Sequence, residues 1–335
     1  MPTRDGSGPE HAELLLLWSA RRAGVLDALT TTAGTPEAVA DETGLDAETS
    51  ERFVRALADY GYLRSVGGEY EVTNRSLGFL ATRDLRSIGT TPRALDLLDA
   101  AAAVGGDGHS RSDDGRAVAT TWNTDGPDES DRPDGPDESD AWLRHRLGAH
   151  AATPTAEVRA NVTAAVHAAP GADRVVDVRG ASGVHAAEFA RRGRDVTLVG
   201  APDVLAVVGP MLAATDVETV AATDVASVPV EGVDLAVLAG VVRRHSPTTD
   251  RQLLRAVHGA LADDGTVVVL EPLRDRSPVA RRVAVERLVV GRGDAYATET
   301  VEGWLDEAGF VDCETRDVPG TATQAVVGRR ERGVD

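Results

Sequence analysis

Apolar residues recur at helical spacing along the first part of the chain. They predict a helix over residues 10–23, a short helix around residues 25–29, and two further helices that start at Thr35 and Asp46. Both of these later helices begin at a residue whose side chain can cap a helix, and both end at a glycine.

Two short strands are expected after these helices. Residues 62–66 and 69–72 flank the pair Gly67-Gly68, and a glycine pair between two such segments indicates a β-hairpin. Helices followed by a two-stranded wing predict a small, mainly α, winged-helix domain over residues 1–95.

The second half of the chain alternates between strand and helix patterns. The expected strands are residues 174–178, 195–199, 233–238 and 266–270. The expected helices are residues 182–190, 202–213, 250–261, 280–289 and 300–308. Valine-rich strands alternating with amphipathic helices predict βαβ units. We therefore expect an α/β, doubly wound Rossmann-like domain over residues 156–330, with a parallel sheet buried on both faces.

Residues 96–155 are expected to be linker helices that carry an acidic insert at about residues 105–140. The segment Asp-Gly-Pro-Asp-Glu-Ser-Asp begins at residue 125 and again at residue 134. The insert is rich in Pro, Gly and acids and nearly free of apolar residues, so we expect it to be disordered. It could be an acidic interaction tail, but its composition favours a solvated insertion between domains.

The chain is strongly acidic and contains no lysine. All 35 basic residues are Arg, against 54 acidic residues, and the net charge is -19. GC-rich codon usage would also replace Lys with Arg, but it does not explain the acids. We favour a halophilic archaeon, in whose salt-loaded cytoplasm screening over about 3 Å at about 1 M salt limits self-repulsion.

Cysteine usage and hydropathy exclude several protein classes. Cys313 is the single cysteine, so neither an intrachain disulfide nor a cysteine metal cluster can form, and we expect no metal site. The apolar run at residues 14–18 is far shorter than the ~20 residues that a membrane span needs. It also lacks the features of a signal peptide. We expect a soluble cytoplasmic protein with no membrane association.

Candidate chemistry lies at the end of the first strand of the second domain. That strand leads into Asp177-Val178-Arg179-Gly180-Ala181-Ser182-Gly183, and a helix follows. In open parallel sheets, ligands bind beyond the carboxyl ends of the strands, and glycines there let backbone amides approach a ligand. Such turns are common, so this turn alone is a weak signal.

Seven short segments stand in a characteristic order along the chain: Ala-Gly-Val-Leu-Asp-Ala-Leu at 23–29, Leu-Ala-Asp-Tyr-Gly-Tyr-Leu at 57–63, and the segments at 70–73, 175–183, 198–205, 261–271 and 308–310. Their residues and order resemble the S-adenosylmethionine-dependent O-methyltransferases that carry an N-terminal winged-helix dimerisation domain, of the plant phenolic and bacterial polyketide type. The resemblance covers nearly the whole chain outside the acidic insert.

The resemblance implies S-adenosylmethionine as cofactor, a small-molecule methyl acceptor, and a homodimer formed through the N-terminal domain. It implies that the cofactor is bound by residues of the turn and of the next two strand ends: Asp177, Gly180, Ser182, Gly183, Asp203 and Asp224. It implies a catalytic His that takes a proton from the acceptor hydroxyl and a carboxylate that orients it; Glu271 matches the carboxylate, and His245 or a water near Glu271 would take the proton.

This sequence departs from the family pattern at four ligand-facing positions. Arg179 and Ala181 stand where the family has glycines, and Gly200 stands where the family has the acid that grips the ribose, so Asp203 is only a displaced substitute. Arg243, 28 residues before Glu271, stands where the family has its catalytic His. Because an Arg stays protonated, it cannot act as a general base, and only a local shift would bring His245 into that role.

Three functions stay open. The first is S-adenosylmethionine-dependent O-methylation of a small molecule. The four replacements favour a second, a catalytically degenerate methyltransferase-fold dimer that acts as a binding or regulatory module. The third, a winged-helix DNA-binding regulator, is the least favoured. Its recognition helix after Asp46 would carry more acids than Arg, and nucleic-acid affinity depends on cationic side chains, so we expect no nucleic-acid partner.

Overall fold

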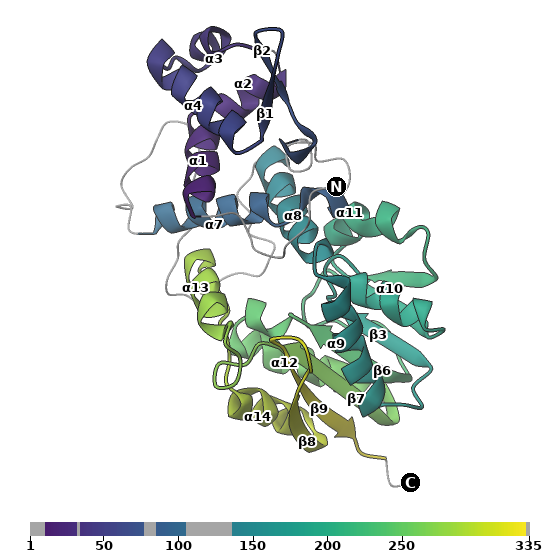
Figure 1. The fold of residues 1–335 in the computed structure, drawn as a ribbon. Helices are drawn as coiled ribbons and strands as arrows, with labels where there is room; N and C mark the ends of the chain where they lie inside the picture. The colour runs from purple at the N-terminus through teal and green to yellow at the C-terminus, as the bar shows by residue number, and fades with distance from the viewer. Residues whose placement is uncertain (1–10, 32–33, 77–84, 105–135, 333–335) are drawn as a thin grey trace. The chain divides into compact units, whose positions relative to one another are not determined.

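The computed structural model describes residues 11–31, 34–76, 85–104 and 136–332. The chain divides into two compact units (Figure 1). The first contains residues 1–110 and 134–152, and the second contains residues 111–133 and 153–335. Most of the predicted acidic insert, residues 105–135, lies outside the described residues.

The first unit is mainly helical. Its helices are α1 (His11–Arg22), α2 (Val25–Thr31), α3 (Pro36–Thr43), α4 (Ala47–Asp59), α6 (Leu85–Ile88), α7 (Thr91–Ala103) and α8 (Pro136–Ala151). The predicted helix starts are confirmed: the Thr35 side chain accepts a hydrogen bond from the Ala38 amide, and Asp46 accepts one from Thr49. Gly44 ends α3 in the left-handed conformation, which glycine adopts without strain.

The predicted hairpin is also confirmed. Strands β1 (Leu63–Val66) and β2 (Glu69–Val72) pair antiparallel, with Leu63 opposite Val72 and Val66 opposite Glu69. Apolar side chains from α1 to α4 and from the hairpin form one core, which includes the fully buried Leu17, Val54 and Leu57.

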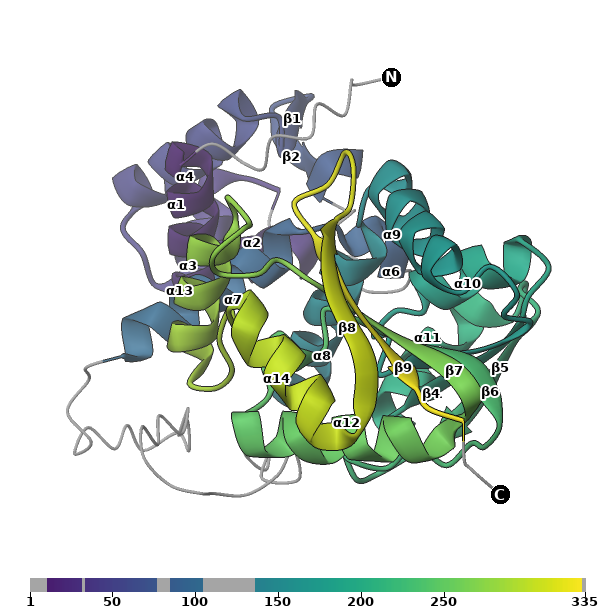
Figure 2. The ribbon, with the colours of Figure 1, turned by 90° about the horizontal axis from the view of Figure 1, so that it is seen from below.

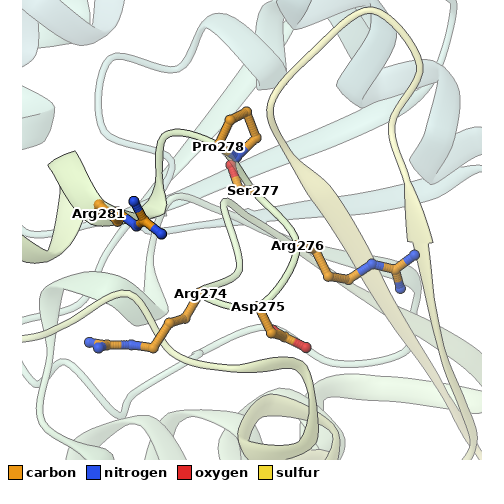
Figure 3. Close-up of a pocket in the computed structure, with 6 residues that line it drawn as sticks. All are labelled: Arg274, Asp275, Arg276, Ser277, Pro278 and Arg281. Atoms are coloured by element: carbon orange, nitrogen blue, oxygen red, sulfur yellow. The ribbon is translucent and has the colours of Figure 1, made fainter.

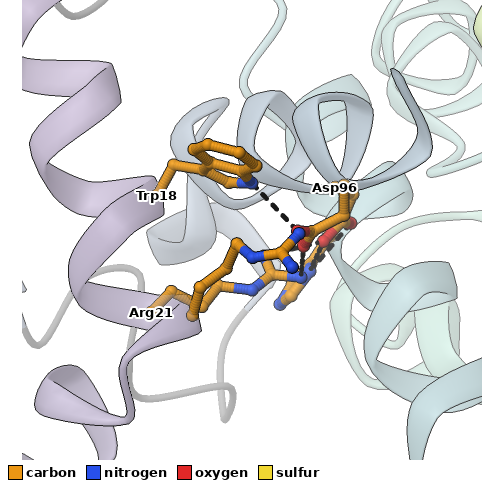
Figure 4. Close-up of polar contacts among 6 residues, drawn as sticks. Trp18, Arg21 and Asp96 are labelled. Carbon is orange, nitrogen blue, oxygen red and sulfur yellow. Dashed lines mark hydrogen bonds and ion pairs between the residues drawn. The ribbon is translucent and has the colours of Figure 1, made fainter. Parts of the chain in front are cut away.

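Polar contacts join α1 to α7 within this unit. The Trp18 indole donates a hydrogen bond to Asp99 at 2.9 Å, and the Arg21 guanidinium donates to Asp96 at 2.9 Å (Figure 4). The Asp96 side chain is only 3% exposed and also lies 3.0 Å from Nδ1 of His145 on α8. This buried carboxylate therefore ties three helices of the unit together.

The last residues of the predicted acidic insert lie within a helix. Helix α8 begins at Pro136, inside the second copy of the acidic repeat. Proline is well placed in the first turn of a helix, because the amide that it lacks has no intrahelical partner there. Residues 136–140 are therefore helical, although their composition resembles that of the rest of the insert.

The second unit is built on a seven-stranded sheet, counted within the described residues. Its strands are β3 (Arg174–Val178), β4 (Asp195–Gly200), β5 (Val217–Ala221), β6 (Val233–Ala239), β7 (Leu261–Glu271), β8 (Phe310–Asp317) and β9 (Gln324–Arg330). Their order is β5-β4-β3-β6-β7-β9-β8. Strands β3 to β7 are parallel, whereas β9 is antiparallel to both β7 and β8.

The α/β doubly wound fold is therefore confirmed, but the expectation of a purely parallel sheet is wrong. The chain returns from β8 to β9 through a short connection, and a short connection can join only antiparallel neighbours. The parallel strands are buried as predicted: Val176, Val237 and Val268 are fully covered.

Two groups of helices pack against the sheet (Figures 1 and 2). One group contains α9 (Thr155–Ala168), α10 (Val184–Arg191) and α11 (Pro202–Leu212). The other contains α12 (Pro247–Ala260) and α14 (Thr298–Ala308), which contact each other and contribute Leu253, Val301 and Trp304 to the main core. Helix α13 (Ala280–Val290) forms a small separate cluster.

This strand order creates one switch point beside β3. The chain proceeds from β3 to β4 and β5 on one side, and then crosses to β6 and β7 on the other side. Ligands of open α/β sheets bind beyond the carboxyl ends of the strands at such a point. The turn 177–183 follows β3 there, and the short helix η1 (Val242–Arg244) follows β6.

Candidate functional site

The turn after β3 has the backbone shape of a glycine turn. Arg179, Ala181 and Gly183 have φ values of 56°, 50° and 72°, all in the left-handed region. The Ala181 amide donates to the Arg179 carbonyl at 2.7 Å, and the Gly183 amide donates to Gly180 at 2.9 Å. This conformation destabilises a residue with a Cβ by roughly 1–2 kcal/mol, so Arg179 and Ala181 adopt a backbone conformation that glycine adopts with less strain.

Asp177 lies beneath this turn and is wholly buried. Its Oδ2 accepts a hydrogen bond from the Ala186 amide at 3.1 Å, in the first turn of α10. Its Oδ1 has no hydrogen-bond partner among the described residues. Burial raises the pKa of this carboxyl to about 7, against the smaller opposing effects of the Ala186 hydrogen bond and the Arg244 charge. Asp177 therefore caps α10 with one oxygen, and its other oxygen could accept a hydrogen bond from a ligand.

Two glycines of the turn are required by close packing. A Cβ on Gly180 would lie 2.2 Å from the Asp177 carboxylate oxygens. A Cβ on Gly183 would lie 3.0 Å from a methyl group of Leu212 and 3.2 Å from one of Leu198. Ser182, between them in the buried turn, is fully covered. Each predicted cofactor residue in the turn thus also has a structural role.

The two predicted acids beyond the turn lie at the ends of β4 and β5. Asp203 is in the first turn of α11, where its Oδ1 accepts a hydrogen bond from the Val204 amide at 2.8 Å. Asp224 lies in the exposed loop after β5, where its Oδ1 accepts one from the Ala226 amide at 2.8 Å. Gly200 ends β4 as a buried residue whose Cβ position is crowded by Leu205.

The Arg179 side chain is folded back over the sheet edge and is only 7% exposed. Its guanidinium donates a hydrogen bond to the Ala222 carbonyl at 3.0 Å and another to the Asp224 carbonyl. The side chain therefore joins the turn after β3 to the loop after β5. The turn is held from its other side by Arg244, which donates to the Arg179 carbonyl at 2.9 Å.

Glu271 ends β7 and is paired with Arg243, which stands where the resembled family has its catalytic His. Its Oε1 accepts a hydrogen bond from the Arg243 amide at 3.3 Å, and its Oε2 lies 3.3 Å from the Arg243 guanidinium. Burial raises the pKa of Glu271, and Arg243 opposes that rise. A guanidinium cannot accept a proton at working pH, so the carboxylate has a partner that cannot act as a base.

His245 has a separate carboxylate partner. Its Nδ1 lies 3.3 Å from Oδ1 of Asp250, and its carbonyl accepts a hydrogen bond from the Tyr296 hydroxyl at 2.8 Å. The His245 side chain is 10% exposed and that of Asp250 is fully covered. Burial and, to a smaller extent, the negative charge of Glu271 raise the pKa of Asp250 to about 9, against the opposing charge of Arg244. The two carboxylates are therefore close enough to influence each other.

A second histidine is buried at the start of α10. Nε2 of His185 lies 3.3 Å from the Asn161 side-chain nitrogen of α9. Burial, together with the nearby Arg243 charge, lowers the pKa of His185 to about 4, so the ring is neutral at physiological pH. His185 thus lies close enough to Arg243 for the charge of that residue to disfavour its protonated form.

Sequence reasoning missed Asp250, Arg244 and His185 as parts of this centre. The sequence offered one signal for this site: Asp250 lies five residues after His245, at the start of a helix. An acid in the first turn of a helix is also common without any role in catalysis. No pattern in the chain indicated that Arg179 would turn toward Ala222.

A separate cavity of about 430 Å³ opens beside the segment after β7 (Figure 3). It is lined by Arg274, Asp275, Arg276, Ser277, Pro278 and Arg281. Two of its arginines already have carboxylate partners, since Arg274 pairs with Asp294, and Arg276 lies 3.3 Å from Asp317. None of the predicted site residues lines this cavity.

Two further searches cover only the described part of the chain. No three His, Cys, Asp or Glu side chains come together there in a way that could hold a metal ion. None of its helices combines the length and apolarity needed to cross a membrane.

Comparisons with known proteins give one domain match and many structural matches. The family model described as the HVO_A0261 N-terminal domain matches residues 10–91. No curated protein matches the sequence. Human N-acetylserotonin methyltransferase, solved in complex with SAM, is 19% identical with a TM-score of 0.62, over 95% of this chain and 94% of that one.

Two further solved structures are similar to a comparable degree. An O-methyltransferase family protein from Burkholderia thailandensis is 17% identical with a TM-score of 0.66, over 97% of this chain and 96% of that one. Mitomycin 7-O-methyltransferase is 20% identical with a TM-score of 0.64, over 95% of this chain and 94% of that one. These likenesses show that the chain has the Rossmann-like methyltransferase fold with an N-terminal helical domain.

Proposed function

We propose that this protein is an S-adenosylmethionine-dependent methyltransferase that methylates a hydroxyl group of a small molecule. The observation that carries the proposal is the left-handed turn 177–183 at the switch point of a methyltransferase-type sheet. The structurally similar proteins include one solved with SAM and another solved with SAH, which supports the same cofactor here.

The residues of the turn suit part of that cofactor. Asp177 offers a buried carboxyl oxygen with no partner among the described residues, and Gly180 leaves the space above it clear of a side chain. Ser182 and Gly183 complete a tight approach to α10, and Asp203 and Asp224 stand at the next two strand ends. The adenosine side is the exception, because Gly200 has no carboxylate and the Arg179 side chain lies across the strand ends.

The cofactor would supply the methyl group, and the chain would position the acceptor and remove its proton. We assign proton removal to His245. When Asp250 is ionised, it accepts the Nδ1 proton of His245, which leaves the lone pair of the ring on Nε2, as a general base requires. Asp250 acts as a positioning residue for His245. Glu271 forms an ion pair with Arg243 and thereby holds the Arg243 charge near His245.

We further propose that the first unit is a winged-helix dimerisation domain, as the resemblance implies. Its helices are followed by a hairpin in the expected order, and the neighbours in the solved structures carry an N-terminal domain in the same place. The charge of -19 with 35 Arg and no Lys supports a halophilic setting for the assembly.

Calorimetry with S-adenosylmethionine and S-adenosylhomocysteine in multimolar KCl tests the cofactor. The proposal predicts binding with a dissociation constant below about 1 mM, which corresponds to about -4.1 kcal/mol. The Asp177→Asn variant should bind more weakly, whereas Asp195→Asn, at the exposed start of β4, should bind like the wild type. Folded protein that binds neither ligand would overturn the proposal.

A pH–rate profile tests the assignment of the base. Because Asp250 must lose its proton to orient His245, and its pKa is raised to about 9, methyl transfer should increase as the pH rises toward 9. His245→Gln should slow transfer by about 10²- to 10⁴-fold without changing cofactor affinity. Asp250→Asn should remove the alkaline rise, and an unchanged profile in that variant would contradict its positioning role.

A further inference from the structure

Arg179 connects three neighbouring strand ends. Its amide donates to the Val199 carbonyl of β4 at 2.8 Å, and its guanidinium donates to Ala222 and Asp224, just after β5. Ala222 in turn donates to the Gly200 carbonyl at 2.9 Å. Because β4 lies between β3 and β5, the side chain crosses the carboxyl end of β4 to reach its acceptors.

The place that this side chain crosses is the adenosine side of the proposed cofactor site. The resemblance puts the ribose at the end of β4, where Gly200 stands, and the adenine near Asp224. The guanidinium donates hydrogen bonds to backbone carbonyls of that same loop, and only 7% of the arginine is exposed. A nucleoside and this side chain cannot occupy the same space.

Two features indicate that the arrangement is built into the site. First, Arg179 adopts φ 56°, a left-handed conformation that is strained for a residue with a Cβ, and such strain concentrates at functional sites. Second, the position next to its path is Gly200, which places no carboxylate beside the guanidinium. An acid at the end of β4 would pair with Arg179 and would hold it away from the carbonyls after β5.

We propose that the Arg179 side chain is an intramolecular competitor for the adenosine side of the cofactor site, and that it must leave the carbonyls of Ala222 and Asp224 before the cofactor binds. This inference rests on the proposed function. It makes cofactor affinity depend on the free energy needed to release one guanidinium. Removing the competitor should tighten cofactor binding about 10- to 100-fold, which corresponds to about 1.4–2.8 kcal/mol.

The test compares four proteins by calorimetry with S-adenosylhomocysteine in multimolar KCl: wild type, Arg179→Gly, Arg179→Ala and Arg174→Ala. Arg179→Gly removes the side chain and the backbone strain, and Arg179→Ala removes the side chain alone. Arg174→Ala is the matched control, because Arg174 also bonds two backbone carbonyls, those of Gly232 at 2.7 Å and Glu231 at 3.1 Å, but at the opposite end of β3.

We expect both Arg179 variants to bind about 10- to 100-fold more tightly than the wild type, with Arg174→Ala unchanged. Equal affinity in all four proteins, or weaker binding in both Arg179 variants, would overturn the competitor while leaving the cofactor in place. No binding by any folded protein would instead overturn the proposed function. Hydrogen exchange supplies an independent readout: ligand should protect residues 222–226 less in the wild type than in Arg179→Ala, because only in the wild type does binding also release the guanidinium from the carbonyls of Ala222 and Asp224.

Discussion

The buried carboxyl of Asp177 should make the stability of the second unit depend on pH in a specific direction. Its pKa is raised from 3.8 to about 7 because the group is wholly buried. Between these values the folded protein holds a proton that the unfolded chain has released. The stabilisation that this bound proton gives the folded protein is therefore fully present below about pH 4 and is lost as the pH rises to about 7.

The size of the effect follows from the shift. Each pKa unit corresponds to about 1.36 kcal/mol, so the complete window is worth about 4 kcal/mol, and the part between pH 5 and pH 7 about 2–3 kcal/mol. Asp177→Asn removes the titrating group but retains an oxygen for the Ala186 amide. The stability of this variant relative to the wild type should therefore rise by about 2–3 kcal/mol from pH 5 to pH 8.

Urea unfolding at constant multimolar KCl measures this difference. Labelling with 5-fluorotryptophan and following the Trp304 resonance reports on the second unit, because Trp304 is buried in its core. Asp195→Asn, which removes an exposed acid from the neighbouring strand, should show a difference from the wild type that does not vary with pH. A pH-independent difference for Asp177→Asn as well would refute the reasoning about its pKa.

The remaining predictions concern the charge and the assembly of the protein. Lowering KCl from about 3 M to about 0.1 M lengthens the screening distance from less than 3 Å to about 10 Å, so a chain of charge -19 should unfold at a markedly lower urea concentration. A midpoint that stays the same would argue against the halophilic explanation. Light scattering in multimolar KCl should give twice the chain mass, and a monomer would contradict the dimer.

Much of the fold could be predicted because the central strands are uniformly apolar. The segment at β7 contains the run Val267 to Leu270, all of it buried, and such runs identify interior strands without further context. Strand β8 was missed for the opposite reason. It lies at the sheet edge, most of its residues are exposed, and its polar sequence matches a loop as well as a strand.

The candidate site could be predicted only for residues that lie at the ends of strands visible in the sequence pattern. The resemblance placed Arg243 at the position of a side chain that Glu271 orients, and the two do pair, because Glu271 ends β7 and Arg243 follows the adjacent strand β6. The direction of the Arg179 side chain depends on carbonyls 43 and 45 residues away, in a loop whose conformation no local pattern specifies. Asp250 likewise gains its perturbed pKa from tertiary burial, which the sequence does not display.

A hydrogen-exchange footprint of bound S-adenosylhomocysteine tests the central claim most directly. The cofactor site proposed at the switch point predicts that ligand slows exchange in residues 177–186, the turn after β3 and the start of α10. It also predicts no change at residues 274–281, which line the separate arginine-rich cavity. Protection confined to that cavity, or none anywhere in a folded protein at saturating ligand, would contradict the claim.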